Sequence, residues 1–128
     1  MIPEPVVGPP DNEIWYTSSD GNVIGSAGNF GANIINDEYN DGHGVITFDG
    51  PVTSIGNGAF DGCYSLTSIT IPNSVTEIED RVFLGCSALT SITFEGTIAQ
   101  WNSITKGENW NNNVPATYVQ CTDGQVTL

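Results

Sequence analysis

The chain has 128 residues, of which 15 are acidic and 2 are basic, so that its formal net charge is −13. This length predicts one domain, and the charge excludes binding to nucleic-acid phosphates and disfavours anionic membrane surfaces. No apolar run approaches the roughly 18 residues that a membrane span needs. The three cysteines do not form a disulfide framework, and we interpret Cys63 and Cys86 as buried free thiols.

Residues 1–10, MIPEPVVGPP, are predicted to be a flexible, proline-rich lead. The segment lacks the basic region and the long apolar stretch that are typical of a signal peptide. We therefore expect no signal peptide in this chain.

Residues 11–44 are predicted to form an N-terminal β cap. The runs EIWYTS and NVIGS flank Asp20-Gly21, a dipeptide that predicts a hairpin between them. Residues 36–41 gather many side-chain oxygens in what we expect to be one acidic loop. Tyr39 breaks the EF-hand ligand pattern, which leaves two alternatives, a non-standard calcium site and a solvated turn.

A 23-residue repeat dominates residues 45–101. TSIGNGAFDGCYSLTSITIPNSV is followed directly by TEIEDRVFLGCSALTSITFEGTI. The apolar positions Ile55, Phe60, Cys63, Leu66, Ile69, Ile71, Val75 and Ile78 recur as Ile78, Phe83, Cys86, Leu89, Ile92, Phe94, Ile98 and Trp101. A half unit, VITFDGPVTSI, precedes them at the same offset. A period of this length predicts a solenoid of about two and a half stacked units.

Each unit divides into a strand and short turns. The alternation in TSITI is typical of a half-buried strand. The spacing of Phe60 and Cys63 favours short helical or 3₁₀ turns. We therefore expect a mainly β solenoid with short helical turns, capped at both ends because terminal units would otherwise expose their core.

The register is expected to fail after Trp101. Lys106 and Asn109 stand where the next Phe and Cys would fall, and the chain ends with a second hairpin signal at Asp123-Gly124. Residues 102–128 are therefore predicted to form a C-terminal cap.

The pattern of Leu66, Ile69 and Ile71 resembles the strand segment of a leucine-rich repeat. The remainder of the unit, with its Gly-Cys pairs at 62–63 and 85–86, is similar to the BspA-like family. On this basis residues 45–101 are identified as leucine-rich repeats. The resemblance implies a surface-exposed or secreted protein that mediates adhesion or host recognition. It also implies a protein partner, with host matrix proteins among the candidates.

Catalytic chemistry finds little support in the sequence. The single histidine, His43, lies in DGHG without an activated serine, and Ser26 lacks a nucleophile-elbow context. One His and three dispersed Cys do not supply the ligands of a zinc site. We predict no catalytic residue, metal site or cofactor, and a hydrolase that uses His43 as its base is the weakest hypothesis.

The outward side chains of the predicted strands form two rows, Val45, Ser68 and Ser91, and Thr47, Thr70 and Thr93. The predicted binding residues are Ser68, Ser91, Thr47, Thr70 and Thr93. Thr also favours strands for structural reasons alone. Rival contact residues are Trp15, Tyr16, Tyr39, Trp101 and Trp110, whose other role is to seal the core ends.

We expect a non-enzymatic binding module, and the alternative is a structural spacer that carries another domain or assembles with itself. The oligomeric state stays open.

Overall fold

The computed structural model describes residues 8–25 and 28–128, and the chain folds mainly as β structure. Most of the predicted lead, residues 1–7, lies outside the described residues. The elements in chain order are β1 (Glu13–Ser18), β2 (Ile34–Asn40), β3 (His43–Phe48), β4 (Ser54–Ile55), β5 (Leu66–Ile71), β6 (Glu77–Ile78), β7 (Ser91–Phe94), α1 (Ile98–Ser103), β8 (Thr105–Lys106), β9 (Tyr118–Cys121) and β10 (Gly124–Thr127).

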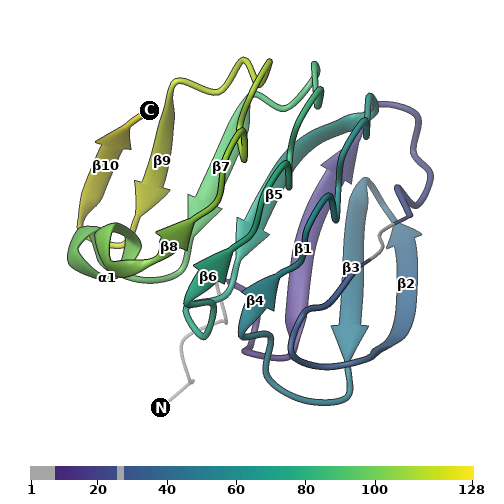
Figure 1. Cartoon of the computed structure of the whole chain (residues 1–128). Helices are drawn as coiled ribbons and strands as arrows, with labels where there is room; N and C mark the ends of the chain where they lie inside the picture. Colours follow the sequence, from purple (N-terminus) through teal and green to yellow (C-terminus); the bar gives the residue numbers. More distant parts are fainter. Residues whose placement is uncertain (1–7, 26–27) are drawn as a thin grey trace, which may run out of the picture.

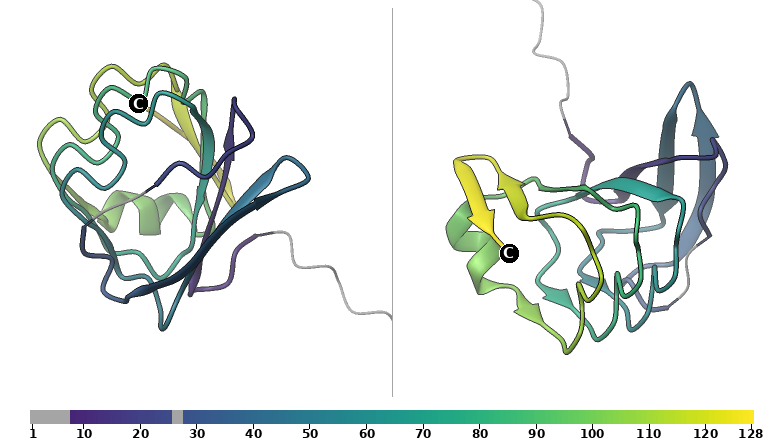
Figure 2. Two further views of the ribbon diagram at one scale, coloured as in Figure 1. Left: turned by 90° about the vertical axis from the view of Figure 1, so that its right-hand side faces the viewer. Right: turned by 90° about the horizontal axis from the view of Figure 1, so that it is seen from above.

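Two sheets enclose the core (Figure 1). The larger sheet has seven strands in the order β10-β9-β7-β5-β1-β3-β2, and the smaller has the order β4-β6-β8. The side chains between the sheets form one buried apolar cluster. The left-hand view in Figure 2 shows the backbone coiling in successive turns around a common axis. Across the described ranges, no helix is long and apolar enough to cross a bilayer.

The 23-residue register is confirmed in both sheets. In the larger sheet β5 and β7 run parallel, with Ser68 opposite Ser91 and Thr70 opposite Thr93. In the smaller sheet β4 and β6 also run parallel, with Ile55 opposite Ile78. Equivalent residues of successive units therefore stack directly on one another.

The turns that join the two sheets repeat as well. Gly58 and Gly62 adopt left-handed backbone angles, φ 64° and 70°, and Arg81 and Gly85 repeat them at 56° and 75°. Backbone hydrogen bonds tie one turn to the next, with the Phe60 amide donating to the carbonyl of the residue before Phe83. These turns contain no regular helix, so the predicted helical component is limited here to tight turns.

The predicted end of the repeat at Trp101 is wrong, because the register resumes after an insertion. β6 pairs in parallel with β8, which places Lys106 opposite Ile78, 28 residues later instead of 23. The additional residues fall in the segment that contains α1, and Trp101 lies on this helix instead of on the ladder. Downstream, Asn109 and Asn113 repeat the two left-handed positions with φ of 58° and 63°.

The N-terminal strands are arranged differently from the prediction. No strand follows Asp20-Gly21 in the described residues up to 25, so the predicted hairpin there is wrong. The hairpin forms instead between β2 and β3, around Asp41-Gly42. Both turn residues have positive φ, 52° and 77°, as a type I′ turn requires.

The prediction that β3 stacks on β5 is also wrong. β1 lies between them, and it pairs antiparallel with both strands. Its inward residues Ile14 and Tyr16 are buried, and Tyr16 packs over Gly44 of β3, where an added Cβ atom would overlap the Tyr16 ring. The amphipathic alternation of β1 thus fills the position that the half unit was expected to occupy.

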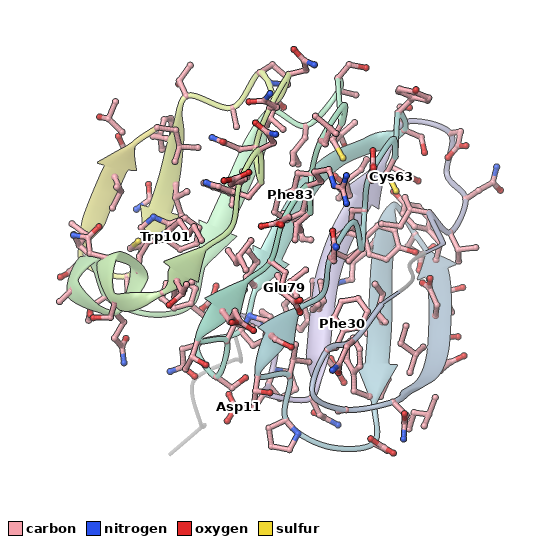
Figure 3. The ribbon with its side chains drawn as sticks, in the orientation of Figure 1. Asp11, Phe30, Cys63, Glu79, Phe83 and Trp101 are labelled. Atoms are coloured by element: carbon pink, nitrogen blue, oxygen red, sulfur yellow. The ribbon has the colours of Figure 1, made fainter. Side chains whose placement is uncertain are left out.

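An aromatic column runs through the core from the N-terminal strands to α1. Phe60 and Phe83 stack with their ring centroids 5.6 Å apart and their planes 7° from parallel. The column includes Phe48, Phe30, Phe60, Phe83, Trp110, Trp101 and Phe94, in which neighbouring centroids lie 5.0–6.3 Å apart. Phe30, Phe83 and Trp101 are labelled in Figure 3, where they mark successive levels of the core.

Candidate functional site

Four of the five predicted binding residues lie together on the outer face of the larger sheet. Ser68 and Thr70 of β5 alternate with buried Ile69 and Ile71, which turns both hydroxyls away from the core. β7 repeats this pattern, so that Ser91 and Thr93 extend the two rows. We call these four residues the hydroxyl patch.

The fifth residue, Thr47, does not join the patch. It lies opposite Glu13 of β1, and the whole width of β1 separates it from β5. The residue beside Thr70 is Trp15 instead. The Trp15 indole N–H donates to Glu13 Oε1 at 2.9 Å, and its ring packs edge-on against His43 with the centroids 5.1 Å apart. Trp15 is therefore a positioned, half-exposed aromatic at one border of the hydroxyl patch.

A second aromatic borders the opposite side of the patch. β9 pairs in parallel with β7, with Val119 opposite Ile92. Val119 is buried, so the preceding Tyr118 belongs to the outer face, where 43% of its surface is exposed. Tyr118 was not among the residues predicted from the sequence. The alternation of apolar Val119 and Cys121 with Tyr118 and Gln120 in YVQC nevertheless indicates a strand with Tyr118 on its outer face.

Hydrogen bonding divides the patch into two parts. The Thr17 hydroxyl lies within 2.6 Å of the Thr67 hydroxyl and also contacts the Ser68 hydroxyl. These contacts fasten β1 to β5, so the Ser68 hydroxyl has a structural role. Thr70 and Thr93 are half-buried and Ser91 is exposed, and these three present their hydroxyls next to the two aromatics.

Two of the rival aromatic residues belong to the core. Tyr16 and Trp101 are each 1% exposed. The Tyr16 hydroxyl donates to Asp37 Oδ1 at 2.7 Å, and burial together with this carboxylate raises the pKa of Tyr16 above its ordinary value. Tyr39 and Trp110 are half-buried against the same core. Of the rival group, Trp15 alone belongs to the outer face of the sheet beside the patch.

The acidic segment 36–41 is not a loop. Residues up to Asn40 form β2, in which Asp37 faces Tyr16 while Glu38 faces the opposite side. This alternation keeps the carboxylates from converging on one point. Among the residues that the structure describes, no group of three or more His, Cys, Asp or Glu could hold a metal ion.

The histidine and the thiols were the other candidates for chemistry. His43 is exposed at the start of β3. All three cysteines are free thiols. Cys86 and Cys121 are buried, whereas Cys63 is half-buried, so the prediction that Cys63 is buried is wrong. Burial raises the pKa of Cys86 to about 12, and its Sγ donates to the Phe60 carbonyl at 3.0 Å. This thiol is therefore protonated at neutral pH, and it packs as a small apolar group.

One sequence comparison identifies the repeat. A family model described as "BspA type Leucine rich repeat region (6 copies)" matches residues 39–107, which is more than half of the chain. No match was found among curated proteins, and none was found among solved structures. The matched range contains the parallel pairs β5–β7, β4–β6 and β6–β8. Leucine-rich repeats are in general modules that bind other proteins and carry no catalytic residues. The chain belongs to the BspA-type leucine-rich repeat family.

Proposed function

We propose that this protein is a short solenoid that binds a protein partner through the outer face of its larger sheet. One observation carries the proposal. Thr70, Thr93 and Ser91 lie side by side on the outer face, and they are bordered by Trp15 on one side and by Tyr118 on the other. Aromatic side chains are enriched among the residues that contribute most to protein interfaces.

The architecture supports this use of the surface. In the proposed solenoid, β1–β3 cap one end and β9–β10 cap the other. The cap bounds expected from the sequence, residues 11–44 and 102–128, stay a proposal. The interior is occupied by stacked side chains, so the face of the sheet remains for contact. β1 widens this face beyond the two repeat strands, and it contributes the only tryptophan that we place on it.

The biological setting that we propose is adhesion or host recognition by a protein at the cell surface or in the secreted fraction. The family supports this setting. The patch is narrow, because neighbouring strands lie about 4.8 Å apart, and a standard interface buries about 800 Å² on each partner. We therefore expect weak single contacts that become useful when many copies are displayed.

The test is a binding screen of the domain displayed in many copies on beads, against host matrix proteins and glycans. The double variant Thr70→Arg/Thr93→Arg should abolish binding of any hit, because two long charged side chains would cover the patch. Trp15→Ala and Tyr118→Ala should each weaken the binding.

A matched control uses the other side of the molecule. Thr76 and Thr105 are both exposed and are joined by a backbone hydrogen bond on the smaller sheet. The double variant Thr76→Arg/Thr105→Arg adds the same charge and should keep the binding. Equal loss in both double variants would argue that charge, and not the patch, decides binding. No hit at high valency would favour the alternative, a structural spacer.

A further inference from the structure

We infer that the open edge of β2 is a second binding site, at which an extended basic peptide adds as a further strand of the larger sheet. β2 and β10 are the two terminal strands of this sheet, and they lie at its opposite ends in Figure 1. Within the described part of the chain, β2 pairs with β3 alone. This site is distinct from the hydroxyl patch.

The hairpin geometry determines which backbone groups are open. The type I′ turn closes on Asn40 and His43, so these two residues form a hydrogen-bonded pair. Bonded and non-bonded pairs alternate along antiparallel strands. The N–H and C=O groups of Asp37 and Tyr39 therefore point away from β3, toward the open edge. A peptide strand that lies beside β2 would pair with these groups.

The side chains of β2 indicate what kind of strand fits. Ile34 and Ile35 are 39% and 63% exposed, which is unusual for two adjacent isoleucines, and they offer apolar contact to an added strand. Asp37 and Glu38 follow them, with one carboxylate on each face of the strand. A strand that alternates lysine with valine places all its lysines on one face. They can lie beside the exposed Glu38, because opposite charges on neighbouring strands attract, while the valines give apolar contact to the isoleucines.

The same charges disfavour a second copy of this chain as the occupant. Two β2 strands paired antiparallel about their centre would place Asp37 opposite Asp37, and like charges in that position are destabilising. The whole chain has only two basic residues, Arg81 and Lys106. Arg81 lies in a turn and Lys106 on the short strand β8. With its net charge of −13, the protein attracts basic partners and repels itself.

The test uses a fluorescein-labelled heptapeptide, Thr-Val-Lys-Val-Lys-Val-Thr, and the whole chain at low ionic strength. Fluorescence anisotropy should show binding that weakens as salt is added. Hydrogen exchange should show new protection of the Asp37 and Tyr39 amides when the peptide is bound. A peptide with glutamates in place of the lysines, and one with proline in place of the central valine, should both fail to bind.

The variants separate this edge from other surfaces. Glu38→Lys reverses an exposed charge of β2, and it should lower the affinity for the peptide by about tenfold or more. Glu77→Lys makes the same change of charge at an exposed position of β6, in the smaller sheet, and it should change the affinity less than twofold. Thr70→Arg/Thr93→Arg should leave peptide binding intact, so that failure of the hydroxyl patch and failure of this site are distinguishable.

Three outcomes would overturn the inference. The first is protection that appears on β10 or on the hydroxyl patch instead of β2. The second is equal binding of the glutamate peptide. The third is no binding at millimolar peptide concentration and low salt.

Discussion

The larger sheet contains two regions, one built from repeated units and one built from strands that do not repeat. In β5 and β7, equivalent residues of two repeat units lie side by side, and Phe60 stacks on Phe83 in the layer below. In β1–β3, the contacts join positions that are not equivalent in a repeat, such as Tyr16 with Gly44 and Tyr16 with Asp37. The first region is stabilised by one set of contacts that recurs from unit to unit, and the second by contacts that occur once.

The two kinds of contact differ in whether a copy of them exists elsewhere in the molecule. A change at a repeated position affects a contact whose copy remains one unit away, whereas a change in β1–β3 removes a contact that has no copy. The aromatic column connects the two regions, because Phe30 and Phe48 continue the line of Phe60 and Phe83. The following predictions test how far the two regions depend on one another.

The largest effect is expected at Phe83, in the middle of the column. Its side chain is fully buried between Phe60 and Trp110. Phe83→Ala should lower the free energy of unfolding by about 3–5 kcal/mol, because it leaves a cavity that the stacked units cannot close. Urea denaturation measures this loss. As a control, Phe83→Leu keeps much of the volume and should cost roughly 1.5 kcal/mol or less. An unchanged melting temperature for the alanine variant would contradict the column.

A smaller effect is expected at Gly44, in the region without repeats. A Cβ atom at this position would overlap the ring of Tyr16, which is 1% exposed and is held by Asp37. Gly44→Ala should therefore cost about 1–3 kcal/mol through overpacking. Gly50→Ala is the matched control, since its added Cβ would lie 4.0 Å from Ala32 Cβ. Equal melting temperatures of the two variants would argue that Tyr16 moves aside freely.

The two regions also differ in how well the sequence predicts them. The apolar spacing was sufficient to align Ile55 with Ile78 and Ser68 with Ser91, because a fixed period directly gives a stacking register. It misplaced Thr47, since nothing in the period shows that β1 would insert between β3 and β5. Both Asp20-Gly21 and Asp41-Gly42 carry the same hairpin signal, and tertiary packing decides which of them forms the turn.

The misplaced end of the repeat has a different cause. A scan at a constant offset of 23 residues loses the register at the insertion of α1, and so it compared Ile78 with Trp101 instead of Lys106. Asn109 and Asn113, four residues apart like Gly58 and Gly62, were the available signal. Asparagine tolerates left-handed backbone angles better than most residues other than glycine.

The residues with left-handed backbone angles provide the third prediction, which concerns a smaller change in the free energy of unfolding. Arg81 has φ of 56° where the unit before it has Gly58 at 64°. Arg81→Gly should raise the free energy of unfolding by about 0.5–1 kcal/mol, because relief of the backbone strain exceeds the added entropy of the unfolded chain. Arg81→Ala keeps the strain and removes the long hydrogen bond to Asn57, so it should not stabilise the protein. A stabilising alanine variant would show that loss of the arginine side chain, and not relief of the backbone, produces the effect.

The smallest effects are expected from the carboxylates, and here neighbouring parts of the N-terminal region should respond to pH with opposite sign. Burial raises the pKa of Asp37 above its ordinary value of 3.8, although the hydrogen bond from Tyr16 partly opposes this shift. Hydrogen bonds from the backbone and side chain of Asn33 lower the pKa of Asp49 below that value. The folded state thus favours the protonated form of Asp37 and the ionised form of Asp49.

Urea denaturation between pH 3 and pH 7 measures both contributions. The contribution of Asp37 to stability is greatest below pH 3.8 and is lost as the pH rises through its raised value, so Asp37→Asn should be relatively most stable at pH 7. The contribution of Asp49 is present above pH 3.8 and is lost as the pH falls through its lowered value, so Asp49→Asn should be relatively least stable at pH 7. Difference curves of the same sign for the two variants would show that general charge repulsion from the net charge of −13, and not these local contacts, governs the acid response.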